Sequence, residues 1–254
     1  MAGRPASGEV ALRDLATTVT RMAADRSTPD RDLAAPSNAM LVAEARAVRE
    51  VPRILWRSPK LWSAPKGSAT VLALPGFGTG DLATAPVRSF LASRGHRTHG
   101  WGLGVNGGDV EELVPPATDR ARELAEKAGG PIALVGWSLG GVVGREVARD
   151  EPELISQVIT YGTPVVGGPK YTRSAAAYGP DRVAAIEQTV AERNQIPIEV
   201  PITAIHSRLD GIVDWLACID EFSPQVRNIE VRSSHVGMGL DPDVWQIVAD
   251  ALAT

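Results

Sequence analysis

The stretch that decides the fold is residues 131–141, PIALVGWSLGG, where a short apolar run is followed by a serine among glycines. The run is typical of a strand buried on both faces of a sheet, and a helical pattern begins directly after it at Ser138. A strand that turns straight into a helix strains its central residue and crowds its neighbours, so only small residues fit two positions away. Gly136 and Gly140 meet that need, and such a turn would lift the Ser138 hydroxyl clear of the sheet.

The same alternation of short apolar runs and longer helical patterns continues on both sides of this stretch. It indicates a mostly parallel sheet of about six strands with helices on both faces, an α/β fold. Strands are expected at 69–74, 131–136, 157–162 and 201–206, with more polar edge strands at 96–101 and 227–232. Helices are expected at 82–94 between an Asp81 N-cap and a Gly95 C-cap, at 117–128 before Gly129, at 138–150 and at 241–252.

The segments at the N-terminus are helical in pattern but separate from that alternation. Residues 1–36 predict a helix on an N-terminal arm, and a second helical pattern runs from Ser37 to near Pro52. We expect residues 37–254 to form one domain, because single α/β domains of this length are common.

One irregular insert, residues 169–200, interrupts the strand and helix pattern. Its predicted helix, near 181–194, carries Val183, Ile186 and Val190 as one apolar stripe. Two interpretations are open for this insert. It is either a small helical lid over a substrate site or a helix packed passively on the scaffold.

Composition narrows the classes of partner. The 254 residues include 44% hydrophobic and 22% charged residues with a net charge of -4, so no basic excess indicates nucleic acid. No run approaches the ~18 apolar residues of a membrane span, and the N-terminal residues lack the apolar core of a signal peptide. We therefore expect a cytoplasmic protein without stable membrane insertion. The single cysteine, Cys218, excludes an internal disulfide, and the sequence has no metal-binding Cys or His motif and calls for no cofactor.

A nucleophilic serine needs a base, and the chain offers four histidines. His235 follows the last expected strand in a short loop of small residues, at the carboxyl edge of the sheet where Ser138 also lies. His96 and His99 are more simply polar positions at a sheet edge, and His206 a buried core histidine. The sequence therefore favours His235 as the base.

The base in turn needs an acid that orients it, and IHSRLDGIVDW supplies two. Asp210 follows the strand end by four residues and precedes Gly211, so its side chain can turn in over the sheet edge. Asp214 opens the next helical pattern and is suited to capping it. Asp210 is the preferred acid and Asp214 the alternative.

The order Ser138, Asp210, His235 along the chain is that of the α/β-hydrolase fold. From about residue 69 onward the chain resembles lipases and esterases of that superfamily, particularly the branch with a YGTP-type motif, here YGTPVVG at 161–167. Lipases of that branch usually carry His after the GTP triplet, where this chain has Val165. The resemblance therefore leaves the subfamily and the substrate open.

The resemblance also implies an oxyanion hole in the loop after the first strand, LALPGFGTG at 72–80. The backbone N–H groups of Phe77 and Leu139 would hold the oxyanion. A nucleotide-binding loop is the alternative for this stretch, but its spacing is G-x-G-x-G and no Lys-Ser/Thr follows.

Together these features predict a carboxylic ester hydrolase acting through a Ser-His-Asp triad and an acyl-enzyme, on a small-molecule ester or lipid with an apolar part. Candidate pocket residues are Trp137, Tyr171, Tyr178 and Met238, each of which is equally explained by core packing. Three alternatives stay open: an acyltransferase or thioesterase with the same triad, a non-catalytic binding protein on this fold, and a glycine-rich turn that only packs a helix. The sequence does not indicate the oligomeric state.

Overall fold

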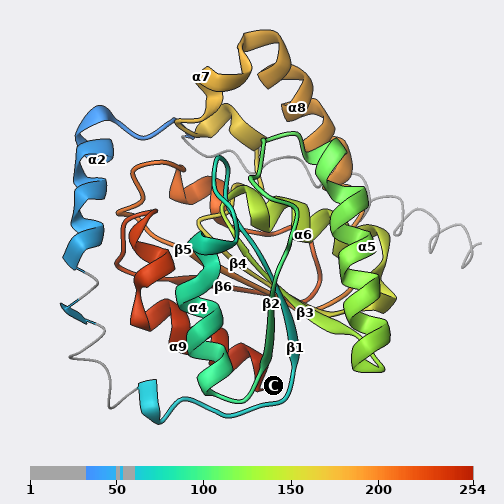
Figure 1. The fold of residues 1–254 in the computed structure, drawn as a ribbon. Coiled ribbons are helices and arrows are strands. Elements are labelled where there is room, and N and C mark those ends of the chain that lie inside the picture. The colour runs from blue at the N-terminus through green and yellow to red at the C-terminus, as the bar shows by residue number, and fades with distance from the viewer. Residues whose placement is uncertain (1–32, 50–51, 54–60, 254) are drawn as a thin grey trace, which may run out of the picture.

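The computed structural model describes residues 33–49, 52–53 and 61–253, so most of the expected N-terminal arm lies outside the described residues. Its centre is one sheet of six strands, all paired in parallel, in the order β2-β1-β3-β4-β5-β6 (Figure 1). The strands are β1 Thr70–Leu74, β2 Arg97–Gly100, β3 Ile132–Trp137, β4 Ile155–Tyr161, β5 Ile202–His206 and β6 Val226–Glu230. The expectation of a mostly parallel sheet of about six strands is confirmed.

Helices occupy the connections between the strands and the segments outside the sheet. The α-helices are α2 Asn38–Ala43, α4 Asp81–Ser93, α5 Val110–Ala128, α6 Leu139–Asp150, α7 Ala175–Tyr178, α8 Pro180–Arg193 and α9 Pro242–Leu252. The 3-10 helices are η1 Glu44–Arg49, η2 Pro152–Leu154, η3 Gly168–Tyr171, η4 Trp215–Cys218 and η5 Gly237–Leu240.

The side chains of each strand explain its place in the sheet. All five residues of β1 and of β5 are buried, as expected for strands covered on both faces. In contrast, β2 and β6 leave residues exposed or half-buried along their whole length, and both lie at the edges of the sheet. The more polar composition of these two runs therefore indicated their edge positions correctly.

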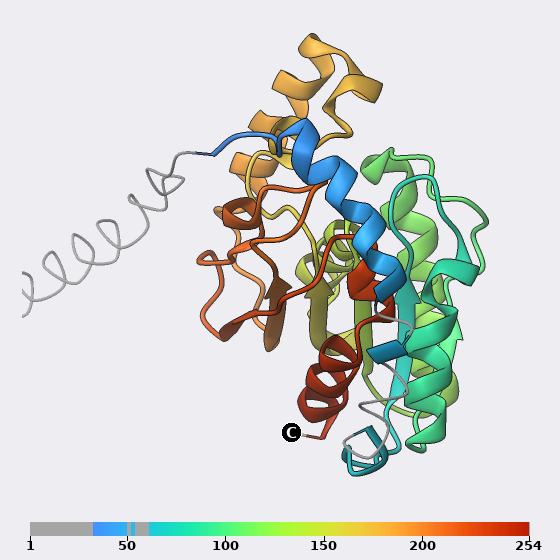
Figure 2. The ribbon, with the colours of Figure 1, turned by 90° about the vertical axis from the view of Figure 1, so that its left-hand side faces the viewer.

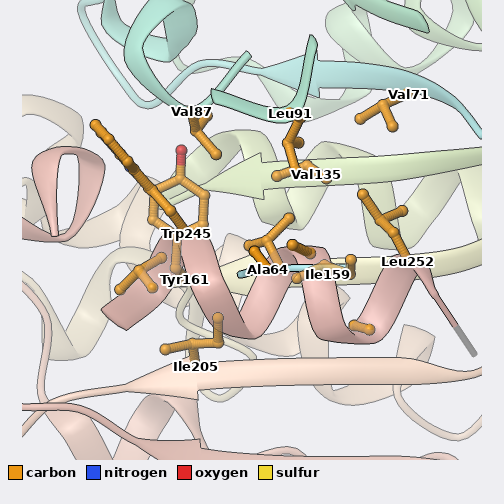
Figure 3. Packing of buried hydrophobic residues seen from close by; sticks show 14 of the residues in the cluster. Ala64, Val71, Val87, Leu91, Val135, Ile159, Tyr161, Ile205, Trp245 and Leu252 are labelled. Atoms are coloured by element: carbon orange, nitrogen blue, oxygen red, sulfur yellow. The ribbon is translucent and has the colours of Figure 1, made fainter. Parts of the chain in front are cut away.

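Two apolar layers hold helices against the two faces of the sheet. On one face, residues of α4 and α9 pack on the strands, among them Leu91 and Trp245 (Figure 3). On the other face, α5 and α6 pack through residues such as Leu124 and Val147. The chain therefore forms three layers, helix, sheet and helix, as Figure 1 shows.

The starts of helices α4 and α5 differ from the expectation for reasons that their side chains explain. The N-cap of α4 is Gly80 rather than Asp81, because the Asp81 carboxylate instead accepts hydrogen bonds from the N–H groups of Trp101 and Gly102. Helix α5 begins at Val110, seven residues before the expected start at 117, and includes two prolines. Prolines usually break helices, but Asp109 caps this one and its first turns pack on the apolar layer beneath.

The N-terminal residues 33–49, called the strap below, run along the side of the domain. The expected helix from Ser37 is present as α2 and continues as η1, with the Ser37 side chain capping α2. Figure 2 shows α2, in blue, below the gold helices α7 and α8. The strap is fixed by bonds from Ala34 N to Asp214 Oδ2 at 2.8 Å and from Arg173 Nη1 to Pro36 O at 3.1 Å.

The insert at 169–200 forms α7 and α8, and the expected helix near 181–194 is α8. Ile186 and Val190 of α8 face Gly168 of η3, and Tyr178 at the end of α7 donates to the carbonyl of Gly108 at 3.0 Å. The insert therefore leans on the loop before α5. Within the described ranges, no helix is long and apolar enough to cross a membrane.

Candidate active site

The turn between β3 and α6 has the strained geometry that the glycines indicated. Ser138 has φ 52° and ψ -125°, the only positive φ outside glycine among the described residues. A Cβ on Gly140 would lie 2.3 Å from the Leu74 carbonyl oxygen, and one on Gly136 would lie 2.4 Å from the Cα of Gly141. These contacts forbid larger residues, so the close packing of α6 on the sheet requires the glycines.

Asp210 and His235 meet above the carboxyl ends of β5 and β6. Asp210 Oδ2 lies 2.7 Å from His235 Nδ1, and both side chains are buried. The other carboxylate oxygen of Asp210 accepts the N–H groups of Ile212 and Val213, each at 2.8 Å. In this arrangement Asp210 Oδ2 accepts the Nδ1–H of the imidazole, which leaves Nε2 with a lone pair.

Asp214, the alternative acid, does not face the histidine. Its Oδ1 accepts the N–H of Leu216 at the start of η4, and its Oδ2 accepts the N–H of Ala34. The capping role that its position suggested is therefore what the structure gives it.

The environment of His235 acts on its pKa in opposite directions. Burial by itself lowers the pKa, whereas the charge and hydrogen bond of Asp210, followed by the charge of Glu44, raise it. The net effect is a pKa above the ordinary 6.5. The imidazolium is thus stabilised where it would form during proton transfer.

The YGTP-type motif lies between the serine and the histidine. Gly162 has φ 61°, and a Cβ there would lie 2.9 Å from His235 Nδ1 and 3.4 Å from Asp210 Oδ2. Thr163 Oγ1 donates to the Ser138 carbonyl oxygen at 2.9 Å. The motif therefore gives room to the imidazole on one side and holds the strained turn on the other.

The loop after β1 lies against the serine. A Cβ on Gly76 would be 3.2 Å from the Ser138 Cβ, and Phe77, next in the chain, is 39% exposed. Asn106 holds this loop, because its side-chain Nδ2 donates to Pro75 O at 2.8 Å and its backbone carbonyl oxygen accepts from Gly78 N at 2.8 Å. Asn106 is fully buried, so it supports the loop from behind.

One cavity of about 880 Å³ joins these groups. Ser138 and His235 line it, together with the expected oxyanion residues Phe77 and Leu139 and the expected pocket residues Trp137 and Tyr178. Two expected pocket residues are absent from its lining. Met238 is fully buried in the core under α9, and Tyr171 packs beside Gly167 and the apolar cluster that includes Val165.

The walls of the cavity are mainly apolar. They extend from the serine along α6 through Val142, under α8 through Ile186 and Val190, and past Val114 of α5. Three charged residues of the lining form ion pairs with one another, because Arg193 pairs with both Glu146 and Asp150. A long apolar group attached to a carbonyl at Ser138 would therefore contact apolar side chains along most of its length.

The remaining histidines lie elsewhere. His206, at the end of β5, is buried and stacks on Trp215, in agreement with a core histidine. His96 is also buried, against Gly67, rather than at a polar edge position, and His99 lies half-buried in β2. Among the described residues, no group of three His, Cys, Asp or Glu side chains is arranged to hold a metal ion.

Sequence reasoning missed Glu44 of the strap. Its carboxylate accepts the N–H groups of Gly211, His235 and Val236. No local signal distinguishes this residue, because a glutamate within a helical pattern is ordinarily an exposed one.

Comparison with solved structures identifies the fold of the chain. No family model and no curated protein matches the chain. Among solved structures, one from work on the metagenome-derived lipolytic enzymes LipS and LipT has a TM-score of 0.58 and 19% identity, covering 75% of this chain and 94% of that one.

Two further solved structures agree with it. Lipase B of Aspergillus fumigatus has a TM-score of 0.59 and 15% identity over 74% of this chain, which spans 53% of that longer protein. The type II thioesterase BorB of the borrelidin biosynthetic cluster has a TM-score of 0.53 and 15% identity, covering 76% and 95% of the two chains. The chain therefore has the α/β-hydrolase fold, as its resemblance implied.

We expect the histidines to separate in a titration followed by NMR of their ring resonances. His235 should titrate above pH 6.5, because Asp210 and Glu44 outweigh its burial, whereas His96 and His206 should titrate below it, because burial dominates there. Asp210→Asn should lower the midpoint of the His235 titration, because it removes the carboxylate that raises the His235 pKa most. Asp119→Asn, exposed on α5, is the control and should leave the midpoint unchanged. An unaltered His235 midpoint in Asp210→Asn would contradict the assigned pairing.

Proposed function

We propose that this protein is a carboxylic ester hydrolase in which Ser138, His235 and Asp210 act as a catalytic triad. One observation carries the proposal. The strained serine and the histidine line the same cavity, and the histidine is already paired with a buried carboxylate at 2.7 Å. A serine, an imidazole and an orienting acid are the groups that acyl transfer through a covalent intermediate requires.

In the first half of the reaction, the Ser138 hydroxyl attacks the ester carbonyl while Nε2 of His235 takes its proton. Asp210 keeps the Nδ1–H in place and stabilises the imidazolium. The tetrahedral oxyanion would be held by the N–H groups of Phe77 and Leu139, which both line the cavity. Leu139 begins the twelve-residue helix α6, whose N-terminus favours negative charge. One such donor typically contributes about 10²–10³-fold in rate.

Collapse of the tetrahedral intermediate breaks the ester bond, and His235 gives its proton to the leaving alcohol. Ser138 is then acylated. In the second half, His235 takes a proton from water, the hydroxide attacks the acyl carbonyl, and the proton returns to Ser138 as the acid leaves. The protein's own groups complete both halves.

The apolar walls support an ester with an apolar acyl or alcohol part. Helix α8 contributes Ile186 and Val190 to the wall, which supports a role of the insert as a substrate-lining lid. Two contacts join the insert to other residues that line the cavity, an ion pair of Arg182 with Asp109 and a ring contact of Tyr178 with Phe77 at 6.0 Å between centroids.

We expect serine-dependent hydrolysis of p-nitrophenyl esters from acetate to palmitate. Ser138→Ala should reduce turnover by several orders of magnitude, on the order of 10⁶-fold when the nucleophile of such a triad is removed. The measurement is release of p-nitrophenol across the series, with Ser89→Ala as control, since Ser89 is exposed on α4. Equal turnover by Ser138→Ala and wild type would refute the proposed nucleophile.

The wall formed by α8 should set the preference for chain length. Ile186→Ser should lower kcat/KM for long-chain esters by about tenfold and leave acetate nearly unchanged, because contact with about two methylenes is lost and each contributes about 0.8 kcal/mol. Ala184→Ser, exposed on the same helix, is the matched control. A chain-length profile identical to wild type would show that α8 does not contact the substrate.

The likeness in fold to a type II thioesterase supports a second candidate, hydrolysis of thioesters by the same triad. Oxygen esters and thioesters of one acyl group distinguish the two. If kcat/KM for an acyl thioester exceeds that for the matched oxygen ester by more than their difference in intrinsic reactivity, the thioesterase is favoured. A higher yield of new ester when an alcohol is added would instead favour an acyltransferase.

A further inference from the structure

Glu44 connects two loops that come from distant parts of the chain. Its Oε1 accepts Gly211 N at 2.7 Å and His235 N at 3.0 Å, and its Oε2 accepts Val236 N at 2.9 Å. Gly211 follows the triad acid and His235 is the triad base, so one carboxylate holds both loops by their backbones. Hydrogen bonds to an ionised acceptor are stronger than neutral ones, so this carboxylate restrains the loops effectively.

The strap fits closely where Glu44 enters. A Cβ on Gly211 would lie 2.3 Å from the carbonyl oxygen of Met40 and 2.9 Å from Glu44 Oε1. The residue after the acid must therefore be glycine for the strap to lie this near. The absence of a side chain at Gly211 leaves room for the last turn of α2 and the glutamate that follows it.

The strap is anchored on both sides of Glu44. Ala34 is bonded to Asp214, and Pro36 accepts from Arg173. Beyond the strap, Arg53 is paired with Asp243 at 2.8 Å, at the start of α9. These anchors lie outside the cavity, and Glu44 is likewise absent from its lining. The strap therefore contacts the loops of Asp210 and His235 on the side that faces away from the cavity.

We propose that Glu44 is a positioning residue for the proposed hydrolase, which sets the distance and orientation of the Asp210 and His235 pair by bracing both loops at their backbone N–H groups. This inference rests on the proposed triad. Glu44 does not touch the substrate or the reacting atoms, so it acts through His235 and Asp210. It makes the strap part of the active site.

The charge of Glu44 also raises the pKa of His235, which an uncharged hydrogen-bond acceptor at the same place would not do. Among the residues that the structure describes, the charges that act on the buried His235 ring are those of Asp210, from the loop after β5, and Glu44, from the strap. Both raise the pKa of His235 against the effect of burial. The base must be neutral to accept the serine proton. Activity should therefore fall as the pH drops through the His235 pKa, and loss of the Glu44 charge should shift that fall to lower pH.

Three substitutions of Glu44 separate the effect of its side-chain length from the effect of its charge. Glu44→Ala removes both, Glu44→Asp keeps the charge but is one methylene too short to reach both loops, and Glu44→Gln keeps the length without the charge. Arg46→Ala, exposed on the same strap, and Glu126→Gln, an exposed carboxylate on α5, are the controls. The readouts are kcat and KM for the ester, the pH profile of kcat/KM, the labelling rate of Ser138 by a fluorophosphonate, and the NMR titration of His235.

Glu44→Ala should lower kcat by about 10²-fold with little change in KM, as small misplacements of catalytic groups do. Glu44→Asp should lower kcat while leaving the His235 titration near that of wild type. Glu44→Gln should keep more of kcat but move both the acid limb and the His235 midpoint to lower pH. Both controls should behave as wild type.

Wild-type kcat and an unchanged His235 midpoint in Glu44→Ala and Glu44→Gln, even with a lower melting temperature, would overturn the proposal and leave Glu44 as an anchor of the strap. If wild-type Ser138 does not react with the fluorophosphonate, the proposed function fails separately. The His235 titration then decides by itself. A lowered midpoint in Glu44→Gln supports the coupling of Glu44 to His235, and an unchanged one overturns it.

Discussion

The close approach of helix α6 to the central strand β3 forces Ser138 into a backbone conformation that side chains rarely adopt. Such a conformation costs on the order of 1–3 kcal/mol and persists only where the surroundings impose it. Here Ser138 N donates to Tyr161 O at 2.9 Å, and Thr163 Oγ1 donates to the Ser138 carbonyl from the far side. Packing of α6 against the sheet through Gly140 completes the restraint. The position of the hydroxyl in the cavity follows from this turn.

The parallel sheet explains how the other groups reach the serine. Every strand ends at the same edge, so the loops after β1, β3, β5 and β6 converge there although they are far apart in sequence. Burying Asp210 would be costly if its charge were unpaired, but two backbone N–H groups and the His235 ring surround it. The cost of placing a carboxylate in the interior is thus offset by bonds that also fix the imidazole.

The strap adds a restraint that the hydrolase sheet by itself does not provide. It crosses the side of the domain and contacts the loops after β5 and β6 through Glu44, 167 to 192 residues away along the chain. The insert with α7 and α8 contacts the loop at Gly108 through Tyr178, and it contacts the strap through Arg173. The insert therefore borders the cavity, and the strap braces the loops that carry Asp210 and His235 from outside it.

Much of this arrangement was determined by local sequence. The apolar runs predicted all six strands, and their polarity predicted which two lie at the edges, because burial of a strand depends on its own side chains. The glycines around Ser138 predicted a strained turn, since no larger residue fits beside a strand that enters a helix directly. The loop positions of Asp210 and His235 followed from the strand ends, and the capping of η4 by Asp214 from its place at the start of a helix.

Only the tertiary structure decided the rest. Met238 and Tyr171 are apolar or aromatic residues near the site in sequence, but side-chain direction in three dimensions turned both away from the cavity. The start of α5 before two prolines depended on packing against the sheet, which outweighs local propensity. Glu44 and Asn106 bond to backbone groups of distant loops, and such partners leave no pattern in a sequence. Hydrogen bonds to a distant backbone depend on how the chain folds back on itself, which residue types alone do not encode.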